Sequence, residues 1–185
     1  MRPPILPHHH SHRLAAAIFA AAFLFGPPAI ADGAGPMVSA PAPITAPAID
    51  LPRLDGTPFS LADRKGGFTL INFWALWCAP CRIEMPALAR LKTEMAGRGL
   101  EIIAVNLGDK PDAVARFLKQ VDVGGLTIVM DRQSAVGRAW HVQALPATFL
   151  VGPDGAITHA AIGAREWAAD AVLQWFEKRL AAAPR

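Results

Sequence analysis

Apolar residues recur along the chain in blocks that follow two different periods. Two nearly continuous apolar runs, 68–76 and 100–107, are rich in β-formers, as expected for strands covered on both faces. Between them, residues 82–98 carry apolar side chains near helical spacing and end at Gly97 and Gly99, which predicts a helix. A strand, a helix and a second strand in this order predict a parallel α/β sheet.

The second half of the domain changes its pattern after Leu145-Pro146. Two short β-rich runs lie on either side of the turn sequence Gly152-Pro153-Asp154-Gly155, which predicts an antiparallel hairpin. The remaining predicted elements, in chain order, are helix 111–121, strand 126–130, helix 134–141, strands 147–151 and 156–162, and an amphipathic helix 165–183.

The N-terminal part carries an uncharged apolar segment, 14–26, which follows Arg2 and Arg13. As a helix it spans about 20 Å, short of a hydrocarbon core of about 30 Å. This short length and the small residues that follow the segment favour a signal peptide that comprises residues 1–31 and is cleaved off. The alternative is an uncleaved membrane anchor. We therefore expect a periplasmic domain, soluble after cleavage or else anchored in the inner membrane and facing the periplasm.

Composition sets the domain organisation. Residues 32–48 are rich in Pro and Ala without an apolar period, which is typical of a linker, so we expect the folded domain over 49–185. A chain of 185 residues holds about one domain, and 52% apolar against 18% charged residues is too apolar for disorder. The formal net charge is +3, and removal of Arg2 and Arg13 with the signal peptide leaves +1, which argues against a nucleic-acid partner.

The only two cysteines, Cys78 and Cys81, lie where the first predicted strand meets the first helix. A helix N-terminus stabilises the thiolate of Cys78, and a shielded Cys81 would resolve a mixed disulfide. A zinc site is one alternative, but zinc needs four ligands and only His141 and His159 remain beyond the signal peptide. A structural disulfide is another, although so short a loop gains little chain entropy.

The residues around this pair resemble a known family. The stretch 73–86, FWALWCAPCRIEMP, is similar to the active-site signature of the thioredoxin superfamily, in its extracytoplasmic TlpA/ResA-like branch. Residues 55–56, 144–150 and 154–155 resemble the same family in the same order, within 49–182. The resemblance implies an α/β thioredoxin fold: a central mixed β-sheet flanked by helices, with an N-terminal extension and a βα insertion.

The resemblance also implies roles for individual residues. Cys78 and Cys81 would be the catalytic pair, joined in a redox-active disulfide, with no other cofactor and no metal. Pro146 would be cis and face the cysteines, so that the backbone of Leu145 pairs with a substrate peptide; an ordinary trans turn is the alternative. Trp77 would be the exposed aromatic that contacts a partner protein.

Two positions depart from the family pattern. Many thioredoxins carry a buried Asp where this chain has Asn72, and Asn cannot act as a base. Glu84, three residues after Cys81, is the available carboxylate, and we hypothesise that it tunes the pKa of Cys81; the alternative is a solvated glutamate favoured by the helix dipole. Relatives dedicated to cytochrome c maturation often carry an acidic residue where Ala147 stands, which weakens an assignment to that client alone.

These features predict an enzyme, a periplasmic thiol-disulfide oxidoreductase that reduces cysteine pairs in client proteins such as apocytochrome c or copper-site assembly proteins. The implied partners are these clients and a membrane electron donor of the DsbD/CcdA kind. The alternatives are a disulfide-forming oxidant or isomerase, and a copper(I)-binding metallochaperone. A peroxidase would need a hydroxyl residue three positions before Cys78, where Ala75 stands.

Overall fold

The computed structural model describes residues 36–182. The predicted signal peptide or anchor, 1–31, lies outside the described residues. Within the described part of the chain, no helix combines the length and the apolarity that a membrane crossing requires.

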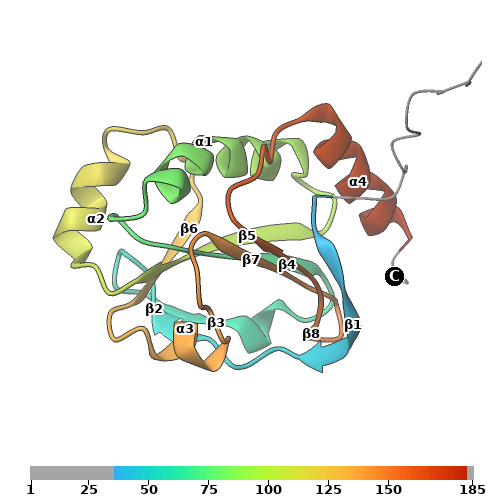
Figure 1. Cartoon of the computed structure of the whole chain (residues 1–185), viewed down its shortest axis with the longest axis horizontal. Coiled ribbons are helices and arrows are strands. Elements are labelled where there is room, and N and C mark those ends of the chain that lie inside the picture. The colour runs from blue at the N-terminus through green and yellow to red at the C-terminus, as the bar shows by residue number, and fades with distance from the viewer. Residues whose placement is uncertain (1–35, 183–185) are drawn as a thin grey trace, which may run out of the picture. The chain divides into compact units, whose positions relative to one another are not determined.

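A mixed sheet of six strands forms the centre of the domain, in the order β1-β8-β7-β4-β5-β6 (Figure 1). The strands β4, β5 and β6 pair in parallel, and β7, β8 and β1 add to them as antiparallel strands. Their bounds are β1 Val38–Thr45, β4 Phe68–Trp74, β5 Leu100–Leu107, β6 Thr127–Asp131, β7 Ala147–Val151 and β8 Ala156–Ile162. The predicted mixed sheet is therefore confirmed, with the reversal after Val151 placed where the turn sequence predicts it.

Helices and a small hairpin cover the two faces of this sheet. Their bounds are α1 Ala79–Glu94, α2 Pro111–Leu118, α3 Ala135–Ala139 and α4 Asp170–Ala181, with a 3-10 turn η1 Leu61–Arg64 and a two-stranded sheet of β2 Asp50–Pro52 and β3 Pro58–Ser60. Figure 1 shows α1 and α4 on one face, and α3 with the β2–β3 pair on the other. The sheet is thus the middle layer of three.

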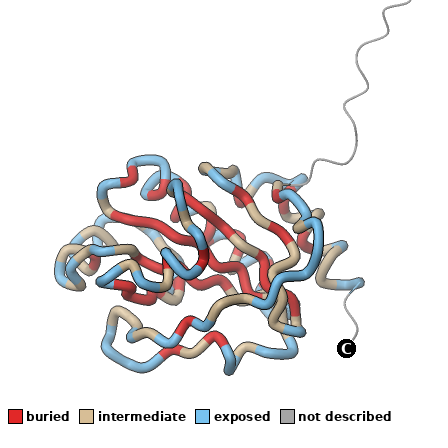
Figure 2. Tube along the Cα trace, turned by 60° about the horizontal axis from the view of Figure 1, so that its bottom comes forward, coloured by how far each residue is buried: buried red, intermediate tan, exposed pale blue. Residues whose placement is uncertain are grey.

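Side chains of β4 alternate between the two faces and divide the core in two. Leu70 and Trp74 belong to the cluster under α1, α2 and α4, whereas Ile71 and Phe73 belong to the cluster shared with α3 and β3. Figure 2 shows the central strands as the most continuously buried part of the trace. Because both faces of β4 are covered, its apolar run is nearly uninterrupted in the sequence.

The structure corrects the predicted linker over residues 32–48. Residues 38–45 form β1, which pairs with β8 at Val38–Ala160 and Thr45–Ala156, with an irregular register in between. All but one residue of this edge strand is exposed, so it has no apolar period to read. Its two prolines fall in the irregular stretch, where no ladder N–H is needed. The domain therefore begins before residue 49.

The last helix also differs from the prediction, because α4 begins at Asp170 rather than at residue 165. Residues 163–169 form a loop instead, and Trp167 within that loop is completely buried. This loop reaches back to α1 and becomes part of the site described next.

Candidate active site around Cys78 and Cys81

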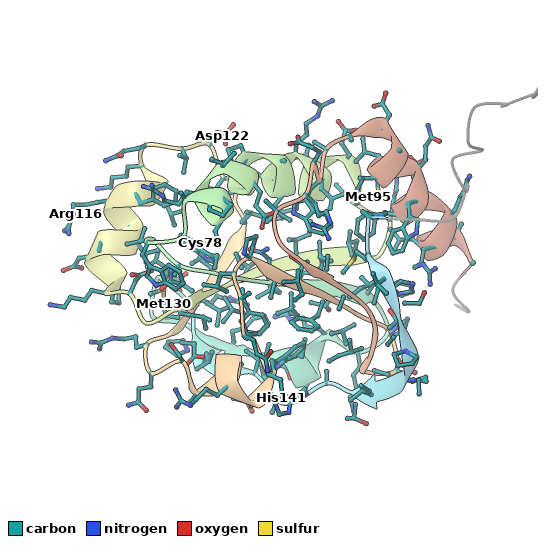
Figure 3. All side chains as sticks on the ribbon, viewed as in Figure 1. Cys78, Met95, Arg116, Asp122, Met130 and His141 are labelled. Atoms are coloured by element: carbon teal, nitrogen blue, oxygen red, sulfur yellow. A yellow bond between two sulfur atoms is a disulfide. The ribbon has the colours of Figure 1, made fainter. Side chains whose placement is uncertain are left out.

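Cys78 and Cys81 are joined by a disulfide at the joint between β4 and α1. Cys78 is the residue that precedes the first turn of α1 (Figure 3). The backbone N–H of Cys81 donates to the Cys78 sulfur at 3.3 Å. Cys78 is 4% exposed and Cys81 not at all. A helix N-terminus with a backbone donor aimed at the first sulfur is an arrangement that stabilises a thiolate there.

The loop before β7 lies at the same edge of the sheet. The Leu145–Pro146 peptide bond is cis, as the resemblance implies. Ala147, the next residue, pairs with Phe73 near the carboxyl end of β4, the end from which the cysteine loop leaves. The carbonyl of Pro146 accepts a hydrogen bond from the N–H of Gly163 at 2.8 Å, which ties this loop to the end of β8.

A pocket of about 340 Å³ brings two more predicted residues together, because Trp77 and Leu145 both line it. Trp77 is 75% exposed, which fits the predicted partner-contacting aromatic. Gln143 and Asp109 also line this pocket. The site therefore offers an open surface of mixed polar and apolar residues, which includes Trp77 next to Cys78.

Asp109 is a residue that sequence reasoning missed. One of its carboxylate oxygens accepts from the N–H of Leu76 at 2.7 Å and from the Asn106 side chain at 2.9 Å. Leu76 lies in the loop just before Cys78, so Asp109 fixes that loop to the end of β5. The sequence did hold a signal, since the polar Asn106 interrupts an apolar strand two residues before Gly108 and three before Asp109.

Glu84 is buried in α1 at 4% exposure, so the alternative of a solvated glutamate is wrong. One carboxylate oxygen accepts from the Asn72 side chain at 2.9 Å; the other accepts from the Arg165 N–H at 3.1 Å and the Trp167 indole N–H at 3.0 Å. Burial raises the pKa of Glu84, while these donors and the charge of Arg165 oppose the rise.

Asn72, which stands where many thioredoxins have an acid, is a hydrogen-bond partner of Glu84. Its amide nitrogen donates to Glu84 and also to the Thr148 hydroxyl at 3.0 Å, which joins β4, α1 and β7. Its amide oxygen is buried and has no hydrogen-bond partner among the described residues. Sequence reasoning missed Thr148, Arg165 and Trp167, because none of them is near Glu84 in the chain.

Metal ligation receives no support from the described residues. In that part of the chain, no three His, Cys, Asp or Glu side chains are grouped so as to hold a metal ion. Both ring nitrogens of His159 are hydrogen-bonded within the protein, to the hydroxyl of Ser39 at 3.1 Å and to that of Thr158 at 3.0 Å.

Comparisons with known proteins agree with this geometry. The AhpC/TSA family model matches residues 44–160. The thiol-disulfide oxidoreductase ResA of Bacillus subtilis is 36% identical over 118 residues, which cover 64% of this chain and 65% of ResA. The chain thus matches just under two thirds of the length of that relative.

Solved structures show the same fold. The crystal structure of a candidate thiol:disulfide interchange protein, DsbE, from Chlorobium tepidum superposes with a TM-score of 0.68 at 29% identity, over 75% of this chain and 96% of that one. The thioredoxin domain of a thiol-disulfide oxidoreductase from Bacteroides vulgatus gives 0.64 at 25% identity, over 74% and 96%. The predicted thioredoxin fold is confirmed.

Proposed function

The chain belongs to the AhpC/TSA family, and we propose that it is an extracytoplasmic thiol-disulfide oxidoreductase that reduces disulfides in client proteins. One observation carries this proposal: the Cys78–Cys81 pair lies at the N-terminus of α1, beside a cis-proline loop and a buried carboxylate. The printed names of ResA and of the Bacteroides vulgatus protein describe the same chemistry in relatives.

The reaction begins from the dithiol form. The Cys78 thiolate attacks one sulfur of a client disulfide, a Cys78–client disulfide forms, and the other client sulfur leaves as a thiolate that takes a proton from water. Cys81 then loses its proton, and its sulfur attacks Cys78. The Cys78–Cys81 disulfide forms, the client leaves with both cysteines reduced, and two electrons have passed from the protein to the client.

Glu84 is the acceptor for the Cys81 proton in this proposal. Both residues are buried on α1, three positions apart, and the transfer is direct or passes through one water molecule. Because burial raises the pKa of Glu84, the carboxylate is a better match for a thiol proton than an exposed glutamate. Asn72 cannot take this role, since an amide does not act as a base.

The client binds at the open surface beside the disulfide. The cis bond presents the backbone at Leu145, where an extended client segment adds strand-like hydrogen bonds. Trp77 supplies an exposed aromatic face next to Cys78. The proposed clients are apocytochrome c or copper-site assembly proteins, with Ala147 arguing against dedication to the cytochrome alone, and a membrane donor of the DsbD/CcdA kind would re-reduce the pair.

The test uses a synthetic peptide that carries an internal Cys-X-X-Cys disulfide. The reduced protein should convert it to the dithiol and end as the Cys78–Cys81 disulfide. Cys81→Ser should stop at a stable mixed disulfide visible by mass spectrometry, and Cys78→Ser should form no adduct. Peptide reduction by Cys78→Ser at the wild-type rate would contradict the proposal.

A further inference from the structure

The loop between β8 and α4, residues 163–169, supplies two of the three hydrogen-bond donors to the Glu84 carboxylate. The N–H of Arg165 and the indole N–H of Trp167 both reach the same oxygen, at 3.1 and 3.0 Å. The Asn72 amide holds the other oxygen. The carboxylate is therefore held by groups that lie far from it in the sequence.

Trp167 is held rigidly in this arrangement. Its side chain has no exposed surface and packs in the core cluster that also contains Cys81 and Trp74. The start of the loop is bonded to the cis-proline through Gly163, and the Arg165 side chain donates to the carbonyl oxygens of Pro36 and Gly163 at 3.1 Å each. The indole N–H thus has a fixed direction, toward Glu84.

Resting on the function proposed above, we propose that Trp167 is a positioning residue whose indole N–H orients the Glu84 carboxylate and keeps it ionised to accept the Cys81 proton. An indole donates a hydrogen bond but cannot accept or release the proton that is transferred. It therefore favours the ionised carboxylate over the neutral acid, and it does so without joining the reaction.

Other groups that face Glu84 define what the test must hold constant. They are the uncharged side chain of Asn72 from β4, and the backbone N–H and the charge of Arg165 from the 163–169 loop. Cys81 lies three residues before Glu84 on α1. Among these, Arg165 is the charged group. The test therefore changes Trp167 alone and keeps each of these residues in the sequence.

The chain offers a matched control in Trp140. Its indole N–H is also buried, but it has no hydrogen-bond partner among the described residues, and it lies in the other core cluster. Trp140→Phe therefore removes the same atoms as Trp167→Phe without removing a bond to Glu84. A change in the Glu84 pKa that both variants share is due to the loss of indole packing. A change found in Trp167→Phe alone is due to the loss of the hydrogen bond to Glu84.

The experiment titrates Glu84 directly by NMR in the oxidised protein, with glutamate labelled at the carboxyl carbon and Glu84→Gln used for assignment. We expect Trp167→Phe to raise the pKa of Glu84 by about one unit, as loss of a hydrogen bond to a charged acceptor predicts, and Trp140→Phe to leave it unchanged. The acid limb of peptide reduction should move to higher pH by the same amount.

A second measurement leaves Trp167 intact. In a pH titration of the wild-type protein, the chemical shift of the Trp167 indole N–H should change with the same midpoint as the titration of Glu84. This change should be absent in Glu84→Gln. Equal Glu84 pKa values in both Trp variants, or an indole resonance that ignores Glu84, would overturn the inference. A wild-type protein that fails to reduce the peptide at any pH would instead overturn the proposed function, because the two NMR titrations do not depend on turnover.

Discussion

Asp109 provides the most direct test of how the cysteine loop is held. Its carboxylate accepts two hydrogen bonds, from the Leu76 N–H at 2.7 Å and from the Asn106 side chain at 2.9 Å. Asp109→Ala removes both, and it leaves the Leu76 N–H and the buried Asn106 amide without their acceptor.

The magnitude follows from the type of bond. A hydrogen bond to a charged group contributes about 1.5–3 kcal/mol, and a donor left unsatisfied costs about 1–3 kcal/mol. Asp109 is only half-buried, so water replaces part of the loss. We therefore expect Asp109→Ala to lower the free energy of unfolding by about 2–3 kcal/mol.

The assay is urea unfolding of the oxidised protein at pH 7, followed by far-UV circular dichroism. Asp109→Asn is the matched control, because it keeps an acceptor oxygen at the same position and loses only the charge. It should cost about 1 kcal/mol, the difference between a charge-assisted and a neutral bond. A loss below about 0.5 kcal/mol in Asp109→Ala would refute the claim that this residue fixes the loop.

Two further predictions concern stability as a function of pH. Burial raises the pKa of Glu84 above its reference value of 4.5. The stability that this residue contributes is therefore complete below pH 4.5 and is lost as pH rises through the pKa of the folded protein. The free energy of unfolding of the wild type, relative to that of Glu84→Gln, should fall over this pH interval. Burial and the charge of Arg179 lower the pKa of His159 below 6.5, so its contribution is present above pH 6.5 and is lost as pH falls through the folded pKa. Urea titrations of the wild type and His159→Gln between pH 4 and 8 should converge toward low pH, and parallel curves would contradict this assignment.

The central strands and the hairpin could be predicted from the sequence because their signals are local. The run 68–76 is covered on both faces and is therefore apolar throughout, and the turn at 152–155 separates β7 from β8 at the predicted residues. The cysteine pair and the proline were recognisable for the same reason, since each motif is contiguous in the chain.

What the sequence could not reveal depends on contacts between distant segments. The edge strand β1 is exposed and has no apolar period, although it is paired along β8. Trp167 stands within the residues predicted to form the last helix, but it lies in the loop before α4. The burial of Glu84 depends on donors 12, 81 and 83 positions away, and no local pattern records such distances.

The direction of electron flow is the centre of the proposed function, and the reduction potential of the Cys78–Cys81 pair tests it most directly. The protein beginning at Asp32 is equilibrated with dithiothreitol and glutathione buffers, and the thiol fraction is measured by alkylation and mass spectrometry. If the protein reduces its clients, we expect a reduction potential near or below about −220 mV, because electrons then pass from the cysteine pair to client disulfides. A value near about −120 mV would make the pair an oxidant and contradict the account.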